Sequence, residues 1–546
     1  MNPTEILLAV AVGLPLLMVL LCVSAPWRQR LPLWFPVAPL PALALAIVGD
    51  RHATLVLGSS RFAFRFALDM PGAVLLGTAA ILWAGAGSYA AGWLRSGRRR
   101  DAFVVCWLMA MTGSVGVFLA ADLISFYLML AVLSVGASGL VLQGEGGDAV
   151  HASGLYLGVA LLAEAFVLAA LVLMVQATPD GSLLLRDAAA ALRSAPSRDT
   201  TLILLLVGLG MKAGLVPMHF WMPRAYRAAP VPAAAVMSGA VVKASVIALV
   251  RFVPFAPGDA LPHLGMPMAV LGMLGAFYGV AIGVMQSHPK VILAYSSVSQ
   301  MGFLMAVIGM GLAAGNPATV MATTFYAAHH LLVKGTLFLA VGVIGLTGVE
   351  ASRRVVIPTA IIALGLGGLP LTGGSLAKVA AKAVMDGALA NSLAVASSVA
   401  TTLLMLHFVR ALSATTAATP AARAGAPLSR AWLGMLLVSL VGPWILFLHI
   451  PMGTLPDALA PAALWAALWP VLAGAVLAAA AYRLTMHGAR TPPNSEGGFR
   501  RGLPRFVAGA GRLAQCADAV LREWSVSCLA LLLVVLLLGG AVAATA

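Results

Sequence analysis

Charged residues are scarce in this chain. They make up 9% of its 546 residues, against about a quarter in soluble globular proteins. Hydrophobic residues reach 61%, and the mean hydropathy is +1.00. There is too little charge to cover a water-soluble fold of this size, which excludes a soluble enzyme or binding domain. The composition predicts an all-α polytopic membrane protein, because helices satisfy their own backbone hydrogen bonds within lipid.

Cysteine is also rare. The four residues, Cys22, Cys106, Cys516 and Cys528, lie far apart, whereas iron–sulfur and zinc sites draw on closely spaced cysteines. The sequence contains no nucleotide, flavin or quinone motif either. We therefore expect no cofactor in this chain, and any redox chemistry is expected to belong to other polypeptides.

Acidic residues are few, with 18 Asp and Glu against 33 Lys and Arg, so the net charge is +15. The excess falls into alternate loops instead of one basic patch, which argues against nucleic acid as a partner. These loops are WRQR (27–30), RSGRRR (95–100), PRAYR (223–227), HPK (288–290), EASRR (350–354), 410–430 and 483–522. By the positive-inside rule their side is the cytoplasm, with both termini outside.

Apolar segments long enough to cross a bilayer, about 20 residues each, number 14 to 16. In the sixteen-span version they begin near residues 4, 33, 71, 102, 123, 152, 200, 231, 266, 291, 319, 356, 390, 431, 463 and 525. The first lacks a basic n-region and a cleavage site, so we expect it to be a retained span. Between the second and third, residues 52–69 alternate partly in hydropathy and predict a small hairpin.

Four regions follow from this pattern. Residues 1–101 hold the N-terminal transmembrane helices, and residues 102–412 form a dense core of spans. Residues 413–482 add further transmembrane helices. Residues 483–546 contain a cytoplasmic connection with a linker rich in Pro, Gly and charge (491–506), an amphipathic segment (512–524) expected at the membrane surface, and the last span.

Two spans of the core carry helix breakers. GLVP (214–217) interrupts the seventh span, and LGLGGLPLTGGSLAK (364–378) places five glycines and a proline in the twelfth. Broken backbone is tolerated at membrane depth only where it is buried in protein or lines a wet cavity. A pair of interrupted spans in corresponding halves also points to an inverted-repeat transporter and its ion path.

Four lysines lie within apolar spans: Lys212, Lys243, Lys334 and Lys378. Each costs about 2.5–3.5 kcal/mol at mid-depth on insertion scales. A single such lysine is explained equally well by a side chain that reaches to the interface, as expected for Lys290. Four together favour a proton relay, because burial disfavours the charged form of a lysine and makes the proton easier to release.

Histidine adds to this pattern. Tyr326, His330 and Lys334 are spaced four apart and share one helix face. A neutral imidazole can accept a proton at one nitrogen and release one from the other, so His330 is a relay candidate, the alternative being a hydrogen-bonded structural histidine. His219 and His288, near cytoplasmic span ends, are weaker candidates for caps or for the cytoplasmic mouth of a path.

Glu164 is the clearest acidic residue within a span. A glutamate in such surroundings is either paired with a cation and takes part in the relay, or it is a neutral acid hydrogen-bonded to a neighbouring helix. The sequence leaves both readings open.

Several stretches resemble one known family. They are KAGLVPMHFWMPRAYRAAPVPAAAVMSGAVVK (212–243), HPKVILAYSSVSQMGF (288–303), HHLLVKGTLFL (329–339) and GLPLTGGSLAK (368–378). On these motifs the chain is identified as a member of the antiporter-like proton-translocating subunits found in respiratory complex I, multi-subunit sodium/proton antiporters and group 4 hydrogenases. The resemblance covers roughly residues 102–410.

The resemblance implies a core of two inverted five-helix repeats, each with one broken helix, and an axis of lysines and histidines across the membrane centre. Lys212 matches the lysine of the first broken helix, and Lys243 matches the bridging lysine of the next helix. His330 and Lys334 match the central relay, and Lys378 matches the terminal lysine of the second broken helix.

One position departs from the family pattern. The family has a glutamate in its fifth span that pairs with the first lysine, whereas this chain has Ala131 at that place. The proton path is therefore either altered or lost, or Glu164 on the next span replaces the missing partner of Lys212. We favour replacement because the rest of the lysine axis is intact.

The resulting expectation is a non-catalytic, multi-pass subunit of a bacterial inner membrane. It would move protons or Na+ while partner subunits of a complex I-like NADH:quinone oxidoreductase or a hydrogenase-4-like complex carry out electron transfer. The basic connection and last span resemble the longer hydrogenase-4 component B type. The alternatives are a secondary Na+/H+ antiporter subunit, the membrane subunit of an inorganic-carbon uptake system, and a structural subunit without transport.

Overall fold

The computed structural model describes residues 2–59, 62–94, 100–346, 349–415, 426–450 and 453–488, together with residue 519. In this part of the chain twelve helices are long and apolar enough to cross a membrane, which confirms the all-α polytopic fold. Three further predicted spans are shorter or broken helices. The predicted linker 491–506, the amphipathic segment 512–524 apart from residue 519, and the last span from Ser525 lie outside the described residues.

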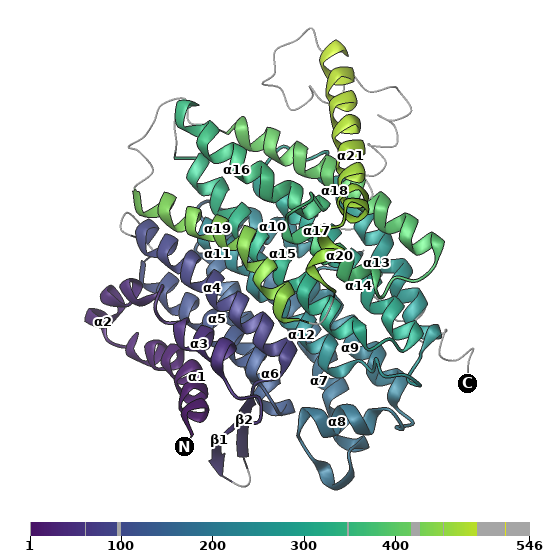
Figure 1. Cartoon of the computed structure of the whole chain (residues 1–546). Helices are drawn as coiled ribbons and strands as arrows, with labels where there is room; N and C mark the ends of the chain where they lie inside the picture. Colours follow the sequence, from purple (N-terminus) through teal and green to yellow (C-terminus); the bar gives the residue numbers. More distant parts are fainter. Residues whose placement is uncertain are drawn as a thin grey trace.

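The N-terminal elements are α1 (Pro3–Leu21), α2 (Ala25–Arg30), η1 (Leu31–Trp34), α3 (Leu40–Val48), β1 (Thr54–Ser59), β2 (Phe62–Ala67) and α4 (Met70–Trp93). They gather at one edge of the molecule (Figure 1). The strands pair antiparallel from Thr54 opposite Ala67 to Ser59 opposite Phe62, so the predicted hairpin is confirmed. The Ala121 N–H donates to the Arg65 carbonyl over 2.9 Å, which ties the hairpin to the loop after α5.

The first half of the core comprises α5 (Arg100–Leu119), α6 (Leu123–Leu142), α7 (Asp148–Ala177), η3 (Pro179–Gly181), α8 (Leu185–Leu192), α9 (Arg198–Ala213), α10 (Trp221–Ala228), α11 (Val231–Val236), η4 (Met237–Val241) and α12 (Lys243–Phe252). The second half comprises α13 (Pro262–Gly283), α14 (Pro289–Ala314), α15 (Ala318–Ile344), α16 (Val349–Gly367), α17 (Gly373–Lys382) and α18 (Ala388–Ser413). Helices α19 (Ala426–His449), α20 (Leu455–Leu459) and α21 (Pro461–Gly488) follow.

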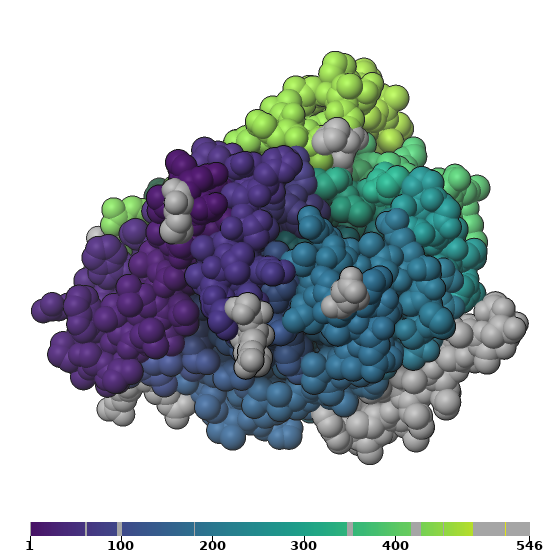
Figure 2. Space-filling view, turned by 90° about the horizontal axis from the view of Figure 1, so that it is seen from below, coloured from purple at the N-terminus to yellow at the C-terminus, as the bar shows by residue number. Residues whose placement is uncertain are grey.

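Each half of the core contains five spans, and the fourth of the five is broken. The break falls between α9 and α10 in the first half and between α16 and α17 in the second. In the predicted topology the first half begins in the cytoplasm and the second outside, as two inverted repeats require. Figure 2 shows the blue first half at the centre of one face, flanked by the purple N-terminal elements, with the yellow-green C-terminal helices along one rim.

The first two helices of each half pack closely because glycines face the neighbouring backbone. A Cβ atom at Gly113 of α5 would lie 2.7 Å from the Met129 carbonyl oxygen of α6. In the second half, a Cβ atom at Gly272 of α13 would lie 2.6 Å from the Gly302 carbonyl oxygen of α14. Any larger residue would push these helices apart, so the glycines fix the pairs α5–α6 and α13–α14.

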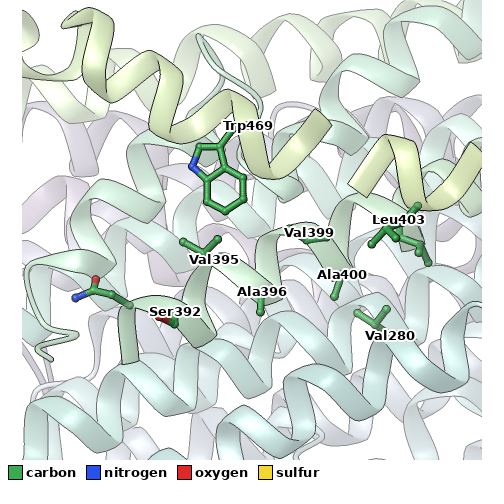
Figure 3. Close-up of a pocket in the computed structure, with 10 residues that line it drawn as sticks. Val280, Ser392, Val395, Ala396, Val399, Ala400, Leu403 and Trp469 are labelled. Carbon is green, nitrogen blue, oxygen red and sulfur yellow. The ribbon is translucent and has the colours of Figure 1, made fainter. Parts of the chain in front are cut away.

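An apolar groove of about 700 Å³ lies between α13, α18 and α21. Trp469 of α21 and Val395 and Val399 of α18 line it, together with Val280 of α13 (Figure 3). None of the four intramembrane lysines lies on its walls. The groove is therefore separate from the candidate ion path, which has to be sought among buried polar side chains.

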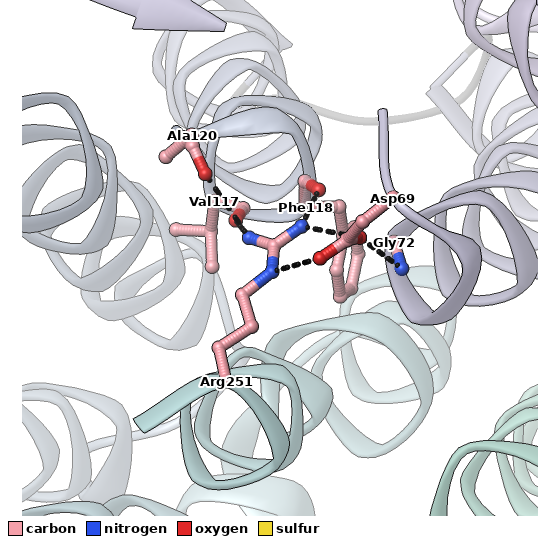
Figure 4. Close-up of polar contacts among 6 residues, drawn as sticks. All are labelled: Asp69, Gly72, Val117, Phe118, Ala120 and Arg251. Atoms are coloured by element: carbon pink, nitrogen blue, oxygen red, sulfur yellow. Dashed lines mark hydrogen bonds and ion pairs between the residues drawn. The ribbon is translucent and has the colours of Figure 1, made fainter. Parts of the chain in front are cut away.

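Arg251, at the end of α12, joins three helices (Figure 4). Its guanidinium forms a bidentate pair with Asp69, with N–O distances of 2.8 and 2.9 Å, and Asp69 also caps α4 by accepting from the Gly72 N–H. The same guanidinium donates to the carbonyl groups of Val117, Phe118 and Ala120 at the end of α5. Arg251 thus supplies donors for carbonyls that the end of a helix leaves without partners.

We expect Arg251→Met to lower the free energy of unfolding by about 2–3 kcal/mol. The Asp69 side chain is 46% exposed, so most of this cost comes from the carbonyl groups that lose their donor. The Arg251 side chain is 9% exposed, and its loss leaves three carbonyl groups without their donor. Arg28→Met is the matched control, because its pair with Asp101 is more exposed and should contribute less than about 1 kcal/mol. Unfolding midpoints of the two purified variants in detergent test this, and equal midpoints would contradict it.

The pH dependence of this stabilisation follows from Asp69. Burial alone would raise the pKa of Asp69, but the Arg251 charge and the hydrogen bonds from Arg251 and Gly72 outweigh it, so the pKa lies below 3.8. A carboxyl whose pKa is lowered by folding stabilises the protein above its unfolded pKa of about 3.9 and loses this effect as pH falls through the folded value. The difference between wild type and Arg251→Met should therefore persist from neutral pH down to about pH 4.

Candidate functional site

Lys212 lies in the last turn of α9, directly before the first break. Gly214 ends the helix in the left-handed conformation, with φ of 73°, which few residues other than glycine adopt readily. The Lys212 Nζ atom is 2.8 Å from Glu164 Oε1 of α7 and 2.6 Å from Ser134 Oγ of α6. Ser134 Oγ in turn donates to Glu164 Oε1 over 2.6 Å. Of the two readings of Glu164, the structure thus supports the ion pair.

Ala131 lies one turn before Ser134 on α6 and lines an open apolar groove of about 420 Å³ together with Leu168 and Leu171 of α7. Because Glu164 stands one turn before Leu168, α7 brings its carboxylate to the level of Ser134. The negative charge is thus supplied from α7, while Ala131 on α6 borders the apolar groove.

A second, smaller cavity joins Lys212 to the helix of the next lysine. Its walls include Ser134 and Lys212 on one side, and Val241 and Ala244, which flank Lys243, on the other. Its volume of about 20 Å³ exceeds the roughly 10–15 Å³ that one water requires. Here the helix from Val231 to Phe252 contains a π-helical turn, η4, a feature frequent at functional sites.

The centre of the site is a pair formed by Lys243 of α12 and His330 of α15. The Lys243 Nζ and His330 Nδ1 atoms are 2.8 Å apart, and the two residues are 0% and 1% exposed. One turn further along α15, Lys334 Nζ donates to the Leu293 carbonyl of α14 over 2.8 Å. The predicted bridging lysine, Lys243, and the two residues predicted as the central relay, His330 and Lys334, therefore lie together in the interior.

A row of neutral polar groups leads from this centre to α18. The Tyr326 hydroxyl donates to Gln300 Oε1 over 2.6 Å, and Gln300 Nε2 donates to Thr401 Oγ1 over 3.1 Å. Tyr326 was expected on the face of His330, whereas Gln300 and Thr401 were not singled out from the sequence. Gln300 and Thr401 lie four helices apart in the chain, so no pattern within either helix predicts that they meet.

Lys378 occupies the far side of the second break. Its Nζ atom donates to the Gly367 carbonyl at the end of α16 and to Ser398 Oγ of α18. The side chain thus reaches back across the break, from α17 to the helix end that precedes it. A carbonyl freed by the break receives a donor in this way, as membrane interiors require.

The weaker sequence candidates have structural partners. His288 caps α14 by accepting from the Lys290 N–H over 3.2 Å. Partial desolvation together with the charges of Lys290 and Arg227 lowers the pKa of this exposed ring below its usual value. It is therefore neutral at physiological pH. Lys290 Nζ donates to the Ala229 carbonyl over 2.8 Å, and the His219 ring is fully buried against Tyr278.

Acidic side chains, which are common metal ligands, are few in the described interior. Among the residues that the structure describes, no group of three or more His, Cys, Asp or Glu side chains could hold a metal ion. The donors gathered at the site are amines, imidazoles, hydroxyls and one carboxylate. That set suits the transfer of protons between nitrogen and oxygen atoms.

Known proteins share both the sequence and the fold. The model of the family described as NADH:quinone oxidoreductase/Mrp antiporter, TM, matches residues 120–406. The NADH-quinone oxidoreductase subunit N of Desulforudis audaxviator is 32% identical over 285 residues, which cover 51% of this chain and 54% of that protein. The chain thus spans about half the length of the curated relatives it matches.

Solved structures extend the likeness in fold beyond the core. A chain of the Mrp complex from Dietzia sp. DQ12-45-1b superposes with a TM-score of 0.69 at 23% identity, covering 88% of this chain and 99% of that chain. A chain of respiratory complex I from Thermus thermophilus gives a TM-score of 0.60 at 25% identity, covering 81% and 98%. Since the family model matches more than half of the sequence, this protein belongs to the NADH:quinone oxidoreductase/Mrp antiporter transmembrane family.

Proposed function

We propose that this chain is the ion-translocating subunit of a multisubunit complex in a bacterial inner membrane. Protons, or Na+, would cross along its buried lysine and histidine residues while partner subunits carry out electron transfer, as in a complex I-like NADH:quinone oxidoreductase or a hydrogenase-4-like complex. The observation that carries the proposal is the Lys243–His330 pair, fully buried with 2.8 Å between Nζ and Nδ1.

Within the described part of the chain this pair has no counter-charge at hydrogen-bond distance, so its burial does not serve stability. A buried cation without a partner of opposite charge costs several kcal/mol, whereas two apolar residues of the same size would pack at no such cost. The pair avoids most of this cost only if it holds a single proton that is shared between the amine and the imidazole. Intramembrane ionisable residues mark ion paths in general, and these two hold a proton at the membrane centre.

The other predicted residues would then act beside the central pair and at the two ends of the path. Lys212 would exchange a proton at the first break, with Glu164 as its counter-charge and Ser134 bridging the two. Lys334 would continue the central relay, and Lys378 would exchange a proton at the second break. One charge that crosses 100 mV requires about 2.3 kcal/mol, so the path needs an energy source in the partner subunits or in a second ion gradient.

The alternatives are supported less well. A structural subunit without transport was suggested by Ala131 alone, and the Glu164–Lys212 pair removes that argument. A secondary Na+/H+ antiporter subunit or the membrane subunit of an inorganic-carbon uptake system would use the same buried residues. No contact among the described residues favours either of them, so they remain outcomes of the test.

Purification of the tagged chain from its native membrane in mild detergent tests the proposal. We expect iron–sulfur, flavin or nickel–iron subunits among the proteins that mass spectrometry identifies in the eluate, together with other membrane subunits. Small antiporter subunits, a soluble zinc protein or the chain alone would instead indicate transport driven by an ion gradient. In that case the coupling to electron transfer would be wrong.

A further inference from the structure

The proposed path has an interruption between α15 and α17. On one side, Lys334 Nζ donates to the Leu293 carbonyl. On the other, Lys378 Nζ donates to Gly367 and Ser398. No hydrogen bond of the described residues joins Lys378 to the central pair, although α15 and α17 pack directly against each other.

His329 lies in this interruption. It precedes His330 on α15 and is 3% exposed, and its ring faces the first turn of α17. A Cβ atom at Gly373 would lie 2.6 Å from His329 Nδ1, and one at Gly374 would lie 3.2 Å from Nε2. The same two glycines also pack against Pro443 and the Gly365 carbonyl. In this crowded turn the imidazole lies against the backbone of α17, four to five residues before Lys378 on the same helix.

Packing alone holds the ring there in the part of the chain that the structure describes. Neither nitrogen of His329 has a partner within the described residues, and each buried unpaired polar group costs about 1–3 kcal/mol. The first turn of α17 is also uncapped, because the Thr372 hydroxyl donates to the Leu369 carbonyl instead. A leucine or phenylalanine would pack in this place without that cost, so stability does not explain the histidine.

We propose that His329 carries protons between the central Lys243–His330 pair and Lys378, an inference that rests on the proposed function. The neutral ring has one N–H donor and one free acceptor nitrogen. A proton arriving from the central residues binds the acceptor nitrogen, and the proton on the other nitrogen leaves to the neutral amine of Lys378. One proton enters and one leaves, and the ring returns to its neutral form with its tautomer exchanged.

The electrostatic surroundings of the ring are consistent with this step. Lys378 on α17 and His330 on the same helix as His329 are the titratable groups that interact with it. Both belong to the proposed path, one on each side of the interruption. The competing route runs through Tyr326 and Gln300 to Thr401, one turn from Ser398 on α18. It includes a glutamine amide, which is a hydrogen-bonding group with no titratable proton.

The test compares two substitutions in the full chain within its native complex. His329→Phe keeps the ring volume, and His329→Gln keeps hydrogen bonding, but neither side chain takes up a proton. Proton uptake is measured in inverted membrane vesicles, energised by NADH or by a sodium gradient, whichever drives uptake by the wild type. We expect both variants to lower uptake by about 100-fold, the lower end of the range for a positioned acid–base group. His449→Phe, at the exposed end of α19, should leave it unchanged.

Four further variants separate the possible failures. If Lys243→Met also leaves uptake unchanged, the proposed function itself is wrong. If Lys243→Met abolishes uptake and His329→Phe does not, only the role of His329 is overturned, and a loss in Gln300→Leu would assign the route to Gln300. On a shared path, combining His329→Phe with Lys378→Met should lower uptake no further than Lys378→Met alone. Assembly of each variant is checked by its recovery in the purified complex.

Discussion

Replacement of Glu164 with Gln is expected to lower ion transport by about 100-fold, the lower end of the range for a positioned acid–base group, because Lys212 loses the carboxylate that stabilises its protonated form. The substitution conserves shape and leaves an oxygen for the hydrogen bond from Ser134, but it removes the charge that lies 2.8 Å from Lys212 Nζ. Lys212 then lacks the counter-charge that stabilises its protonated form, so it no longer gains and releases a proton in step with transport. The measurement is proton uptake in inverted membrane vesicles.

The control for this prediction is Asp101→Asn, which removes a carboxylate from an exposed pair with Arg28. Uptake should not change in that variant. Unchanged uptake in Glu164→Gln, with the complex intact, would show that Glu164 is a structural partner of Ser134 and that Lys212 does not depend on it.

A second substitution asks whether the position of the carboxylate matters. Ala131 borders an open groove of about 420 Å³, one turn from Ser134, so a glutamate side chain has room there without displacing α7. We expect Ala131→Glu, introduced together with Glu164→Gln, to restore a substantial part of the uptake lost in Glu164→Gln alone. Failure to restore it would mean that only a carboxylate from α7 reaches Lys212.

Much of this architecture was predictable because hydropathy and helix breakers act locally. Apolar length predicted the spans, and the glycines and proline of 364–378 predicted the break between α16 and α17. The partial alternation in residues 52–69 predicted the hairpin. In each case the physical cause lies within one segment. Backbone groups in lipid need hydrogen bonds within the helix, and glycine and proline interrupt those hydrogen bonds.

Contacts between segments were predicted less completely. The pairing of Glu164 with Lys212 was one of two open readings, and the four-residue spacing placed His330 and Lys334 on one helix face. Ser134 and His329 gave no comparable signal. Serine is common in membrane helices, and His329 is adjacent to His330, so the sequence gives it no separate role. Their roles depend on which residues of α7, α9 and α17 face them, which no single-segment pattern encodes.

Replacement of Lys243 with Arg is the sharpest test of a proton relay, because it conserves the charge and removes the ability to release a proton. A guanidinium stays protonated under all conditions relevant to proteins. In the wild type, Lys243 Nζ lies 2.8 Å from His330 Nδ1. In the variant, the guanidinium would donate a hydrogen bond to the imidazole and would never accept a proton from it. We therefore expect uptake to fall below about 1% of the wild-type rate.

Lys382→Arg, at the exposed end of α17, is the matched control and should transport normally. Since arginine is larger and Lys243 is fully buried, Lys243→Met serves as a second variant that fills the site without charge. Loss of uptake in both variants, with normal recovery of the complex, assigns the requirement to the proton. If Lys243→Arg transports as well as the wild type, a fixed positive charge at the membrane centre suffices, and the relay through Lys243 and His330 is wrong.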